Sequence, residues 1–148
     1  MALPGDTQER SDVRTDAVHE ALDRLRSVAG LVSACLVEPG SGQVIDSVLG
    51  EAGEPGPLGD TAVRIVAAGA SDIIEVVRLM TASLGDPDDV EDVIVTLGRH
   101  HHLVRALPDA GVDGLFVAMT LDRSRTNLAL ARRQVRALDP VFGRAHAS

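Results

Sequence analysis

Two periodicities of apolar residues divide this sequence into helices and strands. Apolar residues recur every three or four positions over about residues 17–28, 61–84 and 128–138, which is the spacing of one helix face. Short apolar or alternating runs, separated by turn residues, predict five strands at Leu31–Glu38, Gln43–Leu49, Val93–Leu97, 103–106 and Leu115–Leu121. The order α-β-β-α-β-β-β-α, with mostly antiparallel strands and helices packed on them, indicates an α+β fold.

Capping residues and helix breakers support these boundaries. Each predicted helix has a polar residue that can cap its start: Thr15 or Asp16, then Asp60 or Thr61, then Thr126 or Asn127. Gly30 ends the first helix and Pro140 stops the last one. The run 39–42, Pro-Gly-Ser-Gly, forms a hairpin turn between the first two strands. We expect one domain over residues 15–138, a disordered N-terminal tail at 1–14 and a flexible C-terminal tail at 139–148.

The second helix has an apolar arc wider than one sheet face can bury. At about 100° per residue, four polar residues fall in one narrow stripe: Arg64, Ser71, Glu75 and Arg78. Apolar residues cover roughly two thirds of the circumference. Another surface must cover the remainder. A second copy of the same helix is the favoured candidate, which predicts a homodimer, and cover by the protein's own loops is the alternative.

The composition excludes several classes of protein. Aromatic residues make up 1% of the chain and the net charge is −8, which disfavours base stacking and attraction to phosphate backbones. All 14 basic residues are Arg, a bias typical of GC-rich bacterial genomes. With a single cysteine, a polar N-terminus and no run of about 18 apolar residues, we expect a cytoplasmic protein without membrane insertion.

Three clusters could carry chemistry, and each has a simpler structural interpretation. His100 and His102 share one face of a strand, but no third or fourth metal ligand is evident from the spacing. The acidic cluster at 86–92 (Asp86, Asp88, Asp89, Glu91 and Asp92) lacks the ligand frame of a calcium loop, so a solvated or edge-guarding charge run is preferred. Cys35 lies mid-strand among apolar neighbours and is expected to be buried and inert. We therefore expect no catalytic residue, cofactor or metal.

The arginines near the C-terminus form a basic end on an acidic protein: Arg123, Arg125, Arg132, Arg133 and Arg136. An arginine finger donated to a GTPase is conceivable. The preferred interpretation is structural, because Arg123 and Arg125 belong to a strand-to-helix turn and the other three face outward near a helix C-terminus. A contact of these three with an acidic patch on a partner stays open.

Three segments in this order resemble the roadblock/dynein light-chain family, in particular the stand-alone bacterial roadblock proteins. They are GLVSACLVEPGSGQVI, AAGASDIIEVVR, and DDVEDVIVTLGRHHHLVRAL followed by GLFVAMTLDRSRTNLALARRQVR, within about Thr15 to Leu138. The resemblance implies a five-stranded antiparallel sheet with the long second helix on one face and the other two helices on the opposite face.

The resemblance also implies a homodimer, in which the second helices pack together and the third strands pair. The expected interface comprises Val66, Ala70, Ile73, Val77 and Met80 of the helix with Val93, Ile94 and Val95 of the strand. It further implies a small Ras-like GTPase as partner, docked on a surface lined by Arg64, Ser71, Glu75 and Arg78.

The functional hypothesis is a non-enzymatic homodimeric regulator of such a GTPase, acting on its GTP cycle or recruitment. A scaffold or adaptor in a signalling complex, such as one joining a membrane sensor kinase to downstream proteins, is the first alternative. A small-molecule sensor is the second, although a core of Ala, Val and Leu does not suggest the cavity it needs.

Overall fold

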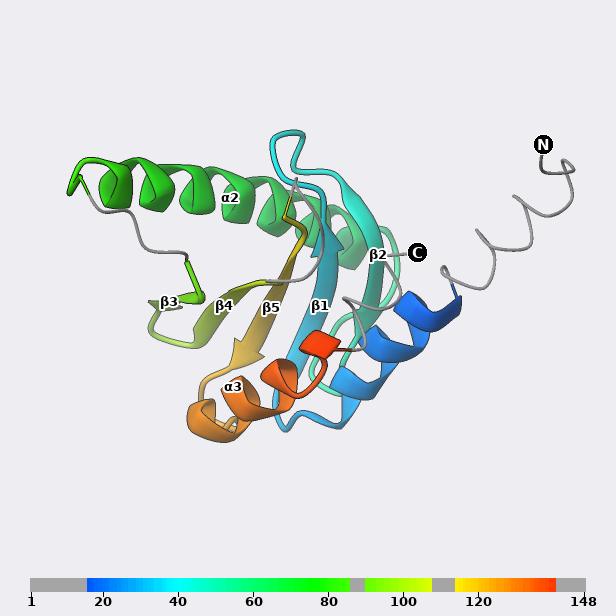
Figure 1. The fold of residues 1–148 in the computed structure, drawn as a ribbon. Coiled ribbons are helices and arrows are strands. Elements are labelled where there is room, and N and C mark those ends of the chain that lie inside the picture. The colour runs from blue at the N-terminus through cyan, green and yellow to red at the C-terminus, as the bar shows by residue number, and fades with distance from the viewer. Residues whose placement is uncertain (1–15, 86–89, 108–113, 141–148) are drawn as a thin grey trace, which may run out of the picture.

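The computed structural model describes residues 16–85, 90–107 and 114–140, and its core is a five-stranded sheet (Figure 1). The strands are β1 (Leu31–Val37), β2 (Val44–Leu49), β3 (Asp92–Thr96), β4 (His100–Ala106) and β5 (Phe116–Asp122). Their spatial order is β2-β1-β5-β4-β3, and every neighbouring pair is antiparallel. The predicted antiparallel sheet and the order of elements are therefore confirmed.

Helices cover both faces of this sheet. The long helix α2 (Pro57–Ala82) lies across one face, whereas the helical segment 16–24, its 3-10 extension η1 (Leu25–Ser27) and α3 (Leu128–Arg136) lie on the opposite face (Figure 1). This is the two-sided arrangement that the family resemblance implies.

The central strand β5 connects the two resulting cores. Because side chains alternate along a strand, Phe116 and Ala118 pack with α2, while Val117 and Met119 pack with the helices on the other face. From Phe116 to Leu121 every residue of β5 is buried, as expected for a strand covered on both faces.

Two element boundaries differ from the prediction for local reasons. Helix α2 begins at Pro57, four residues before Thr61, and ends at Ala82 rather than Leu84. Proline suits the first turn of a helix because its missing N–H has no helical partner there. Strand β4 begins at His100 rather than Leu103, because His100 already pairs with Asp122 of β5.

The chain ends also bear on the domain limits. Residues 1–14, predicted as a disordered tail, lie outside the described residues, as does 141–148. Asp139, which the sequence places in the flexible C-terminal tail, instead accepts hydrogen bonds from the Arg105 guanidinium of β4. Asp139, one residue beyond the predicted boundary at Leu138, thus contacts the sheet, while the limits of the domain and its tails stay a prediction.

Candidate protein-interaction site

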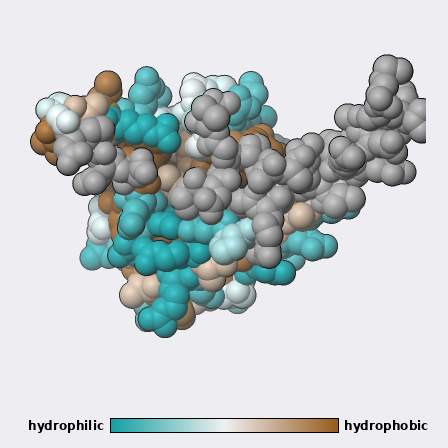
Figure 2. Space-filling model, in the orientation of Figure 1, coloured by the Kyte–Doolittle hydropathy of each residue, from teal (hydrophilic) through white to brown (hydrophobic). Residues whose placement is uncertain are grey.

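The outward face of α2 exposes large apolar side chains. Ile65, Val76, Leu79 and Met80 are 67%, 54%, 67% and 62% exposed. At about 100° per residue, Ile65 and Val76 lie on roughly the opposite side of the helix from the buried Ile74. In Figure 2, brown atoms mark hydrophobic residues at the surface around the end of α2, at the upper left. Such an apolar face on a helix is typical of a surface that another protein covers.

The structure sorts the helix residues of the expected dimer interface into three classes. Met80 is exposed, whereas Val66, Ile73 and Val77 are partly buried at the margin of the outward face. Ala70 is 3% exposed and packs against the sheet, so it presents almost no surface to a partner. The dimer interface expected from the sequence does not include Ile65, Val76 and Leu79. They fall within the wide apolar arc, but periodicity alone does not show which part of that arc faces the sheet.

Strand β3 forms an edge of the sheet beside this helix. Among the described residues it pairs with β4 alone, so its other edge carries unpaired backbone groups. Val93 packs on the α2 side and Ile94 on the opposite side, and Val95 is opposite His102. All three are partly buried. The expected seam residues thus lie on a strand that is open to further pairing.

The polar stripe of α2 remains at the surface except for one residue. Arg64, Glu75 and Arg78 are exposed, but Ser71 is 8% exposed. The turn between β1 and β2 covers it, since a Cβ placed on Gly42 (φ 69°) would lie 3.5 Å from the Ser71 Cβ. Ser71 is therefore a packing residue under the hairpin, and the stripe offers a partner only its charged members.

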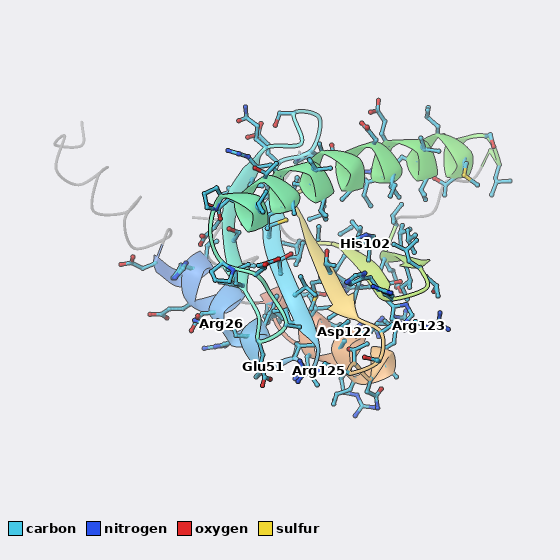
Figure 3. The ribbon with its side chains drawn as sticks, turned by 180° about the vertical axis from the view of Figure 1, so that it is seen from behind. Arg26, Glu51, His102, Asp122, Arg123 and Arg125 are labelled. Carbon is cyan, nitrogen blue, oxygen red and sulfur yellow. The ribbon has the colours of Figure 1, made fainter. Side chains whose placement is uncertain are left out.

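The histidine run on β4 is divided between the two faces of the sheet. His102, labelled in Figure 3, lies on the sheet. Its Nδ1 is 3.1 Å from the Thr120 hydroxyl of β5, whereas His101 is buried on the opposite face. Burial, and then the neighbouring His100, lower the pKa of His102. Within 16–85, 90–107 and 114–140, no group of three His, Cys, Asp or Glu side chains is arranged to hold a metal ion.

The acidic cluster at 86–92 lies only partly within the described residues, and Asp92 at its C-terminal end binds another element of the fold. Asp86, Asp88 and Asp89 lie outside the described residues. Asp92 accepts a hydrogen bond from Arg132 of α3 at 2.9 Å, and Glu91 is exposed. Arg132, expected to face outward, therefore ties α3 to the edge strand. Arg133 and Arg136 are exposed as predicted.

Solved structures identify this architecture. The crystal structure of a Roadblock/LC7 domain from Streptomyces avermitilis is similar with a TM-score of 0.71 and 20% identity, over 88% of this chain and 98% of that one. The chain has a roadblock/LC7 fold. No family model matches the sequence, and no curated protein matches it significantly.

Other roadblock-fold structures extend the comparison. Myxococcus xanthus MglB has a TM-score of 0.70 and 14% identity, over 88% of this chain and 87% of that one. The gliding protein MglB of Thermus thermophilus has a TM-score of 0.69 and 16% identity, over 90% and 91%. An MglB with tetrameric arrangement has a TM-score of 0.67 and 18% identity, over 89% and 88%. At these identities the likeness establishes the fold.

No helix in the described part of the chain is both long and apolar enough to cross a membrane.

Proposed function

We propose that this roadblock-fold protein is a non-enzymatic, cytoplasmic homodimer that binds a small Ras-like GTPase and modulates its GTP cycle or its recruitment. The observation that carries this proposal is the apolar outward face of α2, because an isolated domain gains nothing from exposing Ile65, Val76, Leu79 and Met80 to water. The similarity to an MglB with tetrameric arrangement supports self-association.

The proposed dimer combines the outward face of α2 with the open edge of β3. Packing of two α2 helices would remove their apolar faces from water, and pairing of two β3 edges would satisfy the free backbone groups of the sheet. The exposed charges of the polar stripe, Arg64, Glu75 and Arg78, would remain beside the paired helices. They supply the polar rim on which we place the GTPase.

The regulatory part of the proposal is tested by single-turnover GTP hydrolysis and by nucleotide exchange. Each small Ras-like GTPase encoded by the same genome is assayed with and without the wild-type protein. We expect one of them to bind and to change its hydrolysis or exchange rate. Binding without a change in either rate supports the scaffold alternative, and absence of binding to every such GTPase contradicts the proposal.

A matched pair of variants locates the docking surface. Arg64→Glu/Arg78→Glu reverses two exposed charges on α2, and Arg24→Glu/Arg133→Glu reverses two exposed charges on the opposite helices. We expect the first variant to weaken GTPase binding and the second to leave it within about twofold of wild type, because only the first lies at the proposed interface. Equal losses would remove the assignment to α2.

A further inference from the structure

The charges of this acidic protein are unevenly distributed along the chain. Residues 1–92 carry 18 carboxylates and 6 arginines, whereas residues 93–148 carry 4 carboxylates and 8 arginines. Five arginines of the second part are exposed: Arg99 in the β3–β4 turn, Arg123 and Arg125 in the β5–α3 turn, and Arg133 and Arg136 on α3, the helix that follows this turn. We call these five residues the arginine surface.

Three carboxylates of the neighbouring elements are hydrogen-bonded within the chain. Asp92 accepts from Arg132 at 2.9 Å, Asp139 accepts from Arg105, and Asp122 accepts from the Ser124 amide and hydroxyl at 3.0 and 2.7 Å. None of the five arginines forms an ion pair with another described residue. Within 16–85, 90–107 and 114–140, none of these five guanidinium groups is therefore paired directly with a carboxylate. Asp122, whose hydrogen-bond partner Ser124 is neutral, remains a single negative charge among them.

One end of the arginine surface is hollowed and held in place by the backbone. An open depression is lined by Gly98, Arg99, His100, Asp122, Arg123 and Ser124. The Arg123 amide donates to the Arg99 carbonyl at 2.9 Å, and the Arg123 guanidinium donates to the Leu97 carbonyl at 3.1 Å. These bonds use one of the five guanidinium N–H groups and orient the others without occupying them.

The position of this depression is further restricted by a close backbone contact. Gly30 (φ 80°) accepts from the Asp122 amide at 2.7 Å, and a Cβ at Gly30 would lie 3.0 Å from both Asp122 O and Thr126 N. In Figure 3, Asp122, Arg123 and Arg125 lie at the end of β5 that points away from α2. The β5–α3 turn is thus a fixed platform for its arginines, at a distance from the α2 face.

We infer that the arginine surface is a second docking site, which binds an extended acidic segment of a partner protein. The five guanidinium groups are spread over two turns and along α3 rather than converging on one point, so an extended run of carboxylates can contact more of them than a single small anion. With 1% aromatic residues the chain offers almost no ring on which bases could stack, which disfavours single-stranded nucleic acid as the ligand. This site goes beyond the proposed GTPase surface and would allow both partners to bind together.

Fluorescence anisotropy with a labelled Glu-rich peptide tests this inference. A peptide of about ten residues spans roughly 33 Å when extended, enough to follow the turn and α3. We expect the full-length protein to bind it, and more weakly as salt is raised, because solvent-exposed charges are screened. Arg133→Gln/Arg136→Gln should weaken binding about tenfold, because two charge-assisted contacts are removed.

The matched control is Arg64→Gln/Arg78→Gln, which makes the same change of charge on α2. We expect it to bind the peptide within about twofold of wild type, because long-range effects between exposed charges are small. Equal weakening by both double variants would assign the effect to net charge and overturn the inference, as would failure of the wild type to bind. Tighter binding of a DNA duplex of similar length at the same salt concentration would also overturn it.

Discussion

At the scale of single residues, folding strongly changes the acidity of the Cys35 thiol. It lies in β1 facing α2, is 1% exposed, and donates a hydrogen bond to the Ala118 carbonyl at 3.7 Å. Burial raises the pKa of this thiol from its ordinary value of 9.0 to about 12. The sequence contains no Lys and no Tyr, so few other side chains titrate in this alkaline range.

We therefore predict that alkaline destabilisation depends on Cys35. Above pH 9 the unfolded thiol loses its proton while the folded thiol keeps it, so the free energy of unfolding falls as pH rises, by about 1.4 kcal/mol per unit up to about pH 12. Below pH 9 both states are protonated and the contribution is constant. Urea unfolding at pH 8, 9, 10 and 11 measures this slope. Cys35→Ala should flatten it, and identical slopes for the two proteins would contradict the assignment.

The sequence predicts the burial of a residue correctly where its neighbours along the chain determine that burial. The apolar neighbours of Cys35 predict its burial, which the structure confirms. Ser71 lies in a polar stripe that periodicity places at the surface, yet the Gly42 turn covers it. That contact joins segments far apart in the chain, and helical periodicity contains no information about it.

At the scale of elements, two ion pairs attach α3 and the residues after it to the sheet, and they differ in how far the arginine is exposed. In the first pair Arg105 is 8% exposed and Asp139 is 14% exposed. In the second pair Arg132 is 40% exposed and Asp92 is 13% exposed. The hydrogen bond to Asp139 is the main cause that raises the pKa of Arg105. Arg105 also donates to the Glu91 carbonyl at 3.3 Å, so it connects β4, the β3 entry and the residues after α3.

We predict that Asp139→Ala lowers the free energy of unfolding by about 3 kcal/mol, because it leaves a buried guanidinium unpaired. Arg132→Ala is the control and should cost less, about 1 kcal/mol, since the Arg132 guanidinium is partly exposed and its attraction to Asp92 is screened by solvent. Adding Arg105→Met to Asp139→Ala should recover most of the loss, because an apolar side chain needs no counter-charge. Chemical denaturation followed by circular dichroism measures all four proteins. A loss for Asp139→Ala no larger than that for Arg132→Ala would show that the pair is dispensable.

Sequence patterns predict the existence of each element better than its limits. The helices and strands occur where periodicity places them, but α2 starts at Pro57 and β4 at His100. Polar residues at His100 and His102 interrupt the apolar pattern of β4, and cross-strand pairing with β5 overrides that interruption.

At the scale of the whole molecule, periodicity predicts that the apolar arc of α2 is too wide for one sheet face to bury. It does not predict which side of the helix the sheet leaves exposed. The assignment of helices to the two faces of the sheet came from the family resemblance, and the structure confirms it. The exposed positions Val76 and Leu79 are better tests of self-association than Ile73 or Val77. The latter are partly buried, so an aspartate at either position would disturb the monomer as well as an interface.

We predict that the wild-type protein is a dimer in multi-angle light scattering and that Val76→Glu/Leu79→Glu is a folded monomer. Burying these two side chains against a second copy contributes about 1.5–3 kcal/mol each, so their loss together with buried charge should weaken association at least a hundredfold. Leu130→Glu on α3 is the matched control, because Leu130 is also a large exposed apolar residue, at 45%. It should remain dimeric. A dimer that survives the α2 substitutions and dissociates on Leu130→Glu would move the interface to the other face of the sheet, where the arginine surface would then be covered.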